Sequence, residues 1–450
     1  MKSYATTLVL GGLLVLCLLY LYVVEWPQAQ RKAQEEKQAK QLISFQSDDV
    51  REMILEYRDK DRIVLSKNAD REWQLVQPLQ YRADDAEAED VIRDLVVATV
   101  TRVIRDPESN LGDYGLAPPK LTLSFKLENG TERFFIGEKG PVSSQLYFKR
   151  GGEPDVYLTN LPDRDILSKT PVVLRRKELF DVHRDTIDRI ALEWNSKKFS
   201  LFKAQQTWFL EEPLQAFADQ SVIGMLLFQI ENLRAVDFVD GLEKQEKMLE
   251  QFSGTHHVIH FQVQGDPYSM TFFPGVARTG FVYVLTSEDS PGFIVPRANF
   301  ESIPSNLFQL RDKYLTRVDR SRVTELEILT SGAKVKLPLE SAGDPLPHSV
   351  REFMRRVLDV KAEIFVRETG VAEDFSTRDF DVPALEVKLL GQSKNVLGYL
   401  TVSEIISSGD DDKVGSAYAK GSSLPGVYGI RSSILINIPT KQSVRSEIVP

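Results

Sequence analysis

One phrase occurs twice in this chain of 450 residues. The sequence "REWQLVQPLQYRAD" starts at Arg71, and "QTWFLEEPLQAFAD" starts at Gln206. The shared positions are a Trp, a Pro before Leu-Gln and an Asp: Trp73, Pro78 and Asp84 in the first copy, and Trp208, Pro213 and Asp219 in the second. Because the two tryptophans are 135 residues apart, the chain contains a repeated unit of roughly this length.

A second set of phrases indicates that the unit occurs three times. "VREMILEY" starts at Val50, "IDRIALEW" at Ile187 and "VTELEILT" at Val323, with offsets of 137 and 136 residues. Their apolar residues nearly alternate, which is typical of a strand. Solenoid repeats are only about 20–50 residues long. We therefore predict three tandem repeat domains, over residues 43–176, 177–312 and 313–450, of which the third lacks the Trp and is divergent.

Each unit predicts a sheet with one helix packed on it. In the first copy we expect a strand over Val50–Tyr57, a second from Arg62 and a third that Pro78 ends, since proline lacks the N–H that a sheet needs. Asp84 is expected to cap a helix over residues 85–97 whose apolar residues share one face. Further strand-like segments follow the helix. This order favours an α+β fold with a mostly antiparallel sheet.

The Trp phrase has two interpretations. In the first, the Trp anchors a strand by burying a large area, the Pro ends the strand and the Asp begins the helix. The phrase then marks a strand-to-helix corner of the fold. In the second, Trp73 and Trp208 line a groove that binds a ligand.

The N-terminal residues predict a membrane anchor. Residues 5–24 carry no charge, and twenty residues of helix span about 30 Å, the thickness of the hydrocarbon core. A cleaved signal peptide would have a shorter apolar run and small residues at its cleavage site. A lipoprotein signal at Cys17 would need a small residue where Leu16 stands. We expect a transmembrane anchor over residues 1–27 and a helical stalk over residues 28–42.

The orientation of this anchor has two solutions. The count of Lys and Arg places the C-terminal side in the cytoplasm, because more of them follow the apolar run than precede it. The very short basic tail before the apolar run instead resembles a signal anchor, with the long domain exported. We favour export, which places the bulk of the chain outside the cytoplasm.

Charge and motifs exclude several function classes. The net charge of −9 disfavours a nucleic-acid partner, since phosphate binding needs a basic stripe. The sequence contains no phosphate-binding loop, no G-x-S-x-G elbow and no H-E-x-x-H motif. The cluster His256, His257 and His260 and the run Gly409–Lys413 are better explained as a polar strand edge and a solvated hairpin tip than as metal sites. We therefore expect no catalytic, cofactor-binding or metal-binding residues.

A further motif carries a family resemblance. "DYGLAPPKLTLSF" starts at Asp113 and contains Tyr114, Gly115 and Leu116; Gly137 follows an apolar strand and Tyr147 lies in the next one. Together with the Trp phrase, this pattern resembles the domain-of-unknown-function family 4340. The resemblance implies a bacterial inner-membrane protein with a periplasmic domain, similar in setting to auxiliary components of gliding-motility-type ABC transporters. It implies an ABC permease, its ATPase and a second auxiliary membrane protein as partners, and it carries over no catalytic residue.

Two function classes follow from these observations. The first is a non-catalytic, membrane-anchored interaction protein, because tandem copies add contact area and avidity. The alternative is an extracytoplasmic receptor or enzyme with a site in a cleft between domains.

Overall fold

The computed structural model describes most of the chain after the expected stalk. The described residues are 22, 41–43, 45–105, 111–142, 145–160, 166–287, 291–330, 332–339, 346–367, 380–406, 416–424, 426–440 and 442. The anchor expected over residues 1–27 and the stalk over 28–42 lie almost entirely outside this set. Within it, no helix is long and apolar enough to cross a membrane.

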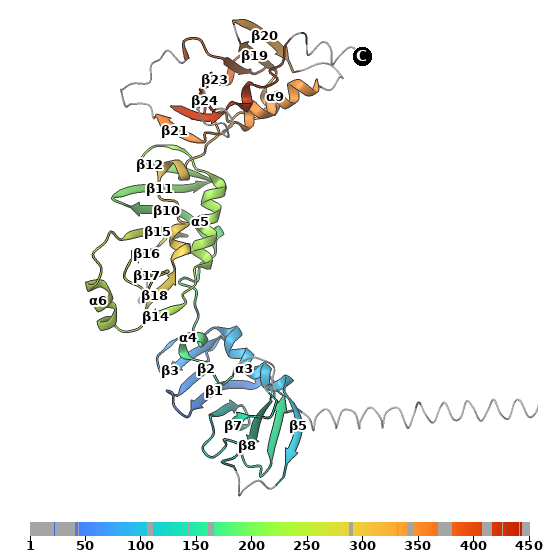
Figure 1. Ribbon diagram of the computed structural model, residues 1–450, viewed down its shortest axis with the longest axis vertical. Coiled ribbons are helices and arrows are strands. Elements are labelled where there is room, and N and C mark those ends of the chain that lie inside the picture. Colours follow the sequence, from blue (N-terminus) through green and yellow to red (C-terminus); the bar gives the residue numbers. More distant parts are fainter. Residues whose placement is uncertain are drawn as a thin grey trace, which may run out of the picture. The chain divides into compact units, whose positions relative to one another are not determined.

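Three antiparallel sheets with few helices make up the described part of the chain, which confirms the α+β class (Figure 1). Contacts group the chain into two compact units, one of residues 1–179 with 234–239 and one of residues 180–233 with 240–450. The first unit holds the first sheet, and the second unit holds the other two. The predicted boundaries between the repeat domains stay predictions.

The first sheet has the strand order β4-β3-β2-β1-β6-β7-β8-β9-β5. Its strands are β1 (Val50–Tyr57), β2 (Ile63–Lys67), β3 (Trp73–Gln77), β4 (Tyr81–Arg82), β5 (Thr99–Ile104), β6 (Leu121–Leu127), β7 (Gly130–Lys139), β8 (Gln145–Arg150) and β9 (Val156–Asn160). In the described residues of this unit, the α-helices are α3 (Asp85–Val97) and the short α4 (Pro171–Leu174). The strand β14 (Asp237–Val239) also falls in the first unit.

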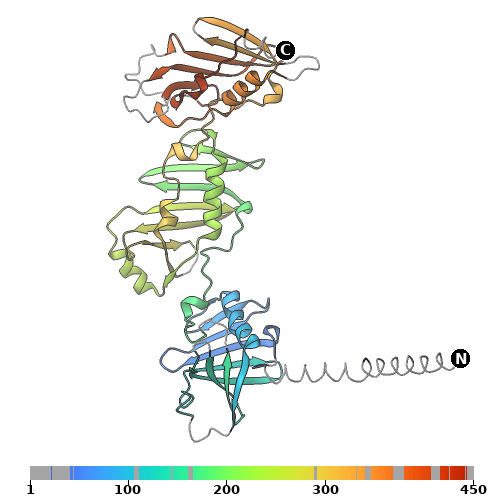
Figure 2. The same cartoon turned by 45° about the vertical axis from the view of Figure 1, so that its right-hand side comes forward.

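Within the second unit, the strands of the second sheet repeat this order as β13-β12-β11-β10-β15-β16-β17-β18. Its strands are β10 (Ile187–Trp194), β11 (Lys197–Ala204), β12 (Thr207–Glu212), β13 (Ala216–Phe217), β15 (His257–Val263), β16 (Asp266–Pro274), β17 (Phe281–Thr286) and β18 (Gly292–Pro296). Figure 2 shows the helix α5 (Gln220–Asn232) crossing these strands. The remaining helices here are α6 (Leu242–Glu250), α7 (Arg297–Glu301) and α8 (Leu307–Leu310).

The third sheet has the order β20-β19-β22-β23-β24-β25-β21 and one long helix, α9 (His348–Asp359). Its strands are β19 (Glu325–Thr330), β20 (Ala333–Pro338), β21 (Ile364–Arg367), β22 (Leu385–Leu390), β23 (Val396–Ile406), β24 (Ser416–Gly421) and β25 (Val427–Arg431). In the described residues, this sheet ends at β20, whereas the first two sheets continue with β3 and β4 or with β12 and β13.

The long helices pack on their sheets in the same way in all three repeats. Each buries residues at the spacing i, i+3, i+4 and i+7, which places one apolar stripe against the sheet. The buried sets are Ala88, Val91, Ile92 and Leu95 in α3, Ile223, Leu226, Leu227 and Ile230 in α5, and Val350, Phe353, Met354 and Val357 in α9. This shared spacing aligns the three helices with one another.

Candidate functional site

The two Trp phrases form equivalent corners between a strand and a helix. Trp73 in β3 is fully buried, and Trp208 in β12 is 4% exposed. The backbone N–H of Trp73 donates to Asp85 Oδ1 at 2.7 Å, and that of Trp208 donates to Gln220 Oε1 at 2.9 Å. In each repeat the first residue of the helix therefore fastens the preceding strand. Both indoles pack in the core, and neither offers an open face to a ligand.

The Pro and Asp of each phrase occupy matching positions in the two corners. Pro78 and Pro213 both follow cis peptide bonds. Asp84 is the N-cap of α3 and accepts from the N–H of Glu87, while Asp219 is the N-cap of α5. Carboxylates at this position satisfy helix N–H groups that have no partner within the helix.

Each capping carboxylate also binds the segment that leaves its own repeat. Lys177 Nζ lies 3.6 Å from Asp84 Oδ2, and Lys313 Nζ lies 2.9 Å from Asp219 Oδ2. The backbones join as well, because the N–H of Asp84 donates to Leu174 O and that of Asp219 donates to Leu310 O. In the first and second repeats, one aspartate thus caps the helix and holds the outgoing linker.

A buried arginine strengthens each of these joints. Arg175 is 1% exposed, and its guanidinium carbon lies 4.3 Å from the ring centre of Tyr81 and 3.8 Å from that of Phe238. Arg311 is 2% exposed and lies 5.9 Å from the ring of Tyr428. Such cation–π contacts contribute about 2 kcal/mol or more where they are desolvated.

The sequence contained a signal for these linker residues that the motif search did not use. Arg175 and Arg311 are 136 residues apart, as are Lys177 and Lys313. The matching segments "LRRKELFDVHRD" and "LRDKYLTRVDRS" predict a repeat, but they do not predict which residue their cations contact. That pairing is a long-range contact and appears only in the structure.

The charge on Asp219 is stabilised by its partners. Partial burial raises the pKa of this carboxyl, but the hydrogen bond from Lys313 and the N–H groups of Val222 and Ser221 outweigh it and leave the pKa below its usual value. Asp219 is therefore ionised at neutral pH, as an ion pair and a helix cap both require.

The residues of the family motif come together on the first sheet. The N–H of Glu138 donates to the carbonyl oxygen of Tyr114 at 2.8 Å, and the rings of Tyr114 and Tyr147 lie 4.9 Å apart. A Cβ on Gly137 would lie 2.1 Å from Tyr114 O, and Gly115 has a φ of +67°. Leu116, in the same loop, is buried. The two glycines allow the loop of residues 113–118 to lie directly on β7, so the motif builds a packed loop.

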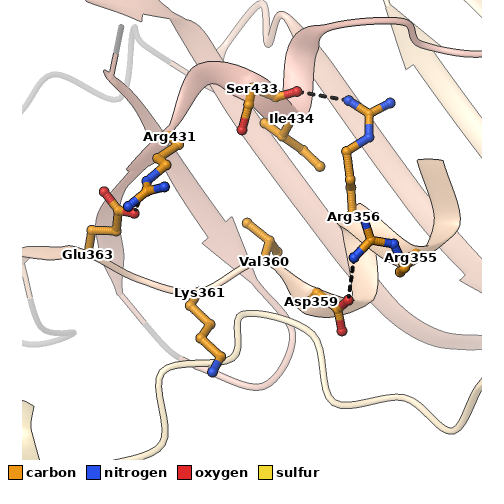
Figure 3. Close-up of a pocket in the computed structure, with 9 residues that line it drawn as sticks. All are labelled: Arg355, Arg356, Asp359, Val360, Lys361, Glu363, Arg431, Ser433 and Ile434. Atoms are coloured by element: carbon orange, nitrogen blue, oxygen red, sulfur yellow. Dashed lines mark hydrogen bonds and ion pairs between the residues drawn. The ribbon is translucent and has the colours of Figure 1, made fainter. Parts of the chain in front are cut away.

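A basic pocket of about 450 Å³ lies in the third repeat (Figure 3). Its charged lining residues are Arg355, Arg356, Lys361 and Arg431, with Asp359 and Glu363. Arg356 Nη1 donates to the carbonyl oxygen of Ser433 at 2.8 Å, and Arg355 Nη1 lies 3.7 Å from Asp359 Oδ2. Arg431 Nε lies 2.5 Å from Glu363 Oε1. Arg355 also binds Glu352, through Nη2 at 2.6 Å and Nε at 3.1 Å. The lining itself carries four positive and two negative groups, so an anionic ligand would share these arginines with their carboxylate partners.

The histidine cluster is divided between two environments. His257 is buried and stacks on Trp194 with ring centres 4.1 Å apart, while His260 is exposed and lies 3.6 Å from Glu193. In the part of the chain that the structure describes, no three His, Cys, Asp or Glu side chains are placed to hold a metal ion. Gly409–Lys413 lies outside that part.

Comparison with protein-family models found one match, to "Domain of unknown function (DUF4340)", over residues 73–251. This confirms the resemblance over a range that begins at Trp73 of the first phrase and contains the loop on β7 and the whole second Trp phrase. Comparison with curated proteins and with solved structures found no match.

Proposed function

Taking the matched family as the premise, we propose that the chain is a non-catalytic, membrane-anchored accessory protein of an ABC-type transport complex similar to those of gliding motility. Its anchor is the apolar segment of residues 5–24, and its three repeats face the periplasm. The partners are an ABC permease, its ATPase and a second anchored auxiliary protein. The chain contributes binding surfaces to this complex.

The observation that supports this proposal most strongly is the duplicated joint. Asp84 with Lys177 and Asp219 with Lys313 occupy equivalent places, and each pair ties an outgoing linker to the repeat that it leaves. The residues that the two repeats share most closely therefore serve packing and joining. This is the construction that a multi-domain binding scaffold needs, since a firmly held linker limits the entropy lost when several domains bind one partner.

Purification from native membranes tests the accessory role. The full-length chain is tagged at its C-terminus, extracted in a mild detergent and analysed by mass spectrometry, with an unrelated single-span protein as the control. We expect a permease, its ATPase and a second anchored protein in near-stoichiometric amounts. Recovery of the chain alone, before and after chemical cross-linking, would refute the transporter assignment.

Cysteine labelling tests the orientation separately. The only native cysteine is Cys17, inside the apolar segment, so a cysteine introduced at the exposed Lys244 on α6 would be the only one in the repeats. A membrane-impermeant maleimide should label K244C in cells whose outer membrane has been permeabilised. Labelling that appears only after the inner membrane is broken would place the repeats in the cytoplasm.

A receptor for a small anion is the second candidate, and the basic pocket of the third repeat favours it. Calorimetric titration of the full chain with inorganic phosphate and with citrate tests this function. Heat of binding that is lost in Arg355→Gln would support a receptor. Absence of binding at millimolar anion would exclude these ligands and leave the accessory role as the remaining proposal.

A further inference from the structure

In the residues that the structure describes, the third sheet has no counterpart of β3 and β4 or of β12 and β13. Residues 68–84 connect β2 to α3 and contain β3 and β4, and residues 205–219 connect β11 to α5 and contain β12 and β13. The corresponding connection in the third repeat, residues 339–347, is shorter, and its described residues, 339, 346 and 347, form no strand. In the described residues, β20 therefore pairs with β19 alone and forms the edge of its sheet.

In the first two repeats, further strands and the outgoing linker cover the equivalent edge of the sheet. Beyond β3 and β12 lie the two-residue strands β4 and β13, and the outgoing linkers then bridge to them through the pairs Ala83–Arg175 and Ala218–Arg311. Short, covered edges are how sheets avoid pairing with other chains. The edge formed by β20 is longer, because the strand runs from Ala333 to Pro338. Backbone N–H and C=O groups along this edge can accept another strand.

The chain itself shows which side chains fit at this edge. In the second repeat Ile190 lies opposite Leu201, and in the third Leu326 lies opposite Leu337. Leu337 of β20 therefore corresponds to Leu201 of β11. In the second repeat, Leu210 of β12 lies opposite Leu201, and both are buried. An added strand would therefore place an apolar residue opposite Leu337 and, two positions away on the same face, the equivalent of Trp208.

Charge on the outer face points to an acidic strand. Glu212 of β12 lies 3.0 Å from Ser200 Oγ and 3.7 Å from Lys198 Nζ. The same register places Lys336 at the position of Ser200 and Lys334 at that of Lys198. The third repeat thus presents two lysines, with side chains about half exposed, where a carboxylate of the next strand would lie. Lys334 Nζ lies 2.6 Å and Lys336 Nζ 3.2 Å from the carboxylate of Glu327 on β19, so an added carboxylate would share these lysines with Glu327.

We propose that the edge of β20 binds an extended segment of a partner protein, which adds the missing strand antiparallel to β20. The segment carries a bulky aromatic residue and a Leu two positions apart on one face, followed by acidic residues that face Lys334 and Lys336. This is recognition by strand addition, in which backbone hydrogen bonds supply affinity and alternate side chains supply specificity. The inference goes beyond the proposed function and does not depend on it, because it concerns any partner that offers such a segment.

Hydrogen exchange with mass spectrometry on the detergent-solubilised full chain tests this proposal. The probe is a synthetic peptide with the sequence of residues 206–213, "QTWFLEEP", and the controls are a scrambled peptide and one with both Glu replaced by Lys. We expect the amides of residues 333–337 to exchange faster than those of β2 and β11 in the free chain, and to slow on the order of tenfold with the probe. The controls should have little effect.

A chain variant makes the charge argument specific. In Lys336→Glu, the probe should protect β20 less than in the native chain. The lysine-bearing peptide should instead protect β20 in this variant, and that protection would show that the variant is folded. Slow exchange of β20 in the free chain would overturn the proposal, because the chain would then cover its own edge. Slow exchange that depends on protein concentration would do so too, because a second copy of the chain would then cover the edge. Protection confined to the first two repeats, or equal protection by the scrambled peptide, would also overturn it.

Discussion

At the scale of single residues, the most constrained position is Gly137. A Cβ there would meet the carbonyl oxygen of Tyr114 at 2.1 Å, and that oxygen is held by the N–H of Glu138. We predict that Gly137→Ala lowers the free energy of unfolding by about 1–3 kcal/mol, the usual cost of overpacking. Urea unfolding followed by circular dichroism measures this change.

Gly224 provides the matched control for this substitution. It lies inside α5, and a Cβ there would meet nothing within 4 Å. Gly224→Ala should therefore stabilise the protein by about 0.5–1 kcal/mol, because alanine loses less backbone entropy in a helix. Equal effects of the two substitutions would contradict the close approach of the Tyr114 loop to β7.

His257 predicts a pH dependence near neutrality. Burial, with a smaller contribution from His256, lowers the pKa of His257. Above about pH 6.5 the residue is neutral in both folded and unfolded states. Below that pH the unfolded state binds the proton first, so the free energy of unfolding falls as the pH falls, until the folded state is protonated too.

His257→Phe should remove this component while keeping the aromatic stack on Trp194. The measurement is urea unfolding between pH 5 and 7, where most carboxylates stay ionised. His260→Gln is the control, because His260 is 48% exposed. An unchanged pH slope in His257→Phe would show that another group causes the dependence.

At the scale of elements, the joint between α5 and the following linker makes a separate prediction. The lowered pKa of Asp219 stabilises the fold above the unfolded pKa of about 3.9, and this stability is lost as the pH falls through the folded value. Asp219→Asn keeps a good helix cap but loses the charge that Lys313 binds. We expect it to cost about 1 kcal/mol at pH 6 and nothing once the native Asp219 is protonated.

A double-mutant cycle with Lys313→Gln isolates the pair. If the ion pair is responsible, Asp219→Asn should cost less in the Lys313→Gln background than in the native chain, since the partner is already absent. Purely additive costs would show that Asp219 acts as a cap alone.

Elements also show how far the sequence could predict the fold. The sequence predicted α3 correctly, with Asp84 as its N-cap and residues 85–97 as its bounds. This was possible because the capping residue and the apolar spacing are local features of the helix. The contacts of Arg175 with Phe238 and of Lys177 with Asp84 could not be predicted in this way. They join segments distant in sequence, and repetition showed only that the residues recur.

At the scale of the whole molecule, the sequence predicted three copies of one architecture and a divergent third copy. The structure adds the physical meaning of that divergence. Where the Trp phrase is missing, the described residues of the third repeat hold no counterpart of the two strands beside it, and among them the third sheet ends on β20. The packed loop of Tyr114 and the buried tryptophans likewise show that the most recognisable motifs serve folding. Binding is therefore expected at surfaces where the repeats differ.

Cross-linking mass spectrometry on intact native membranes tests the central claim, that this chain is an accessory subunit of a transport complex. A lysine-reactive cross-linker is applied to cells that express the tagged full-length chain, and links within the chain serve as the internal control. The account predicts links from lysines of the repeats to an ABC permease or to its anchored auxiliary protein. Abundant links within the chain, without any to a transporter subunit, would contradict it.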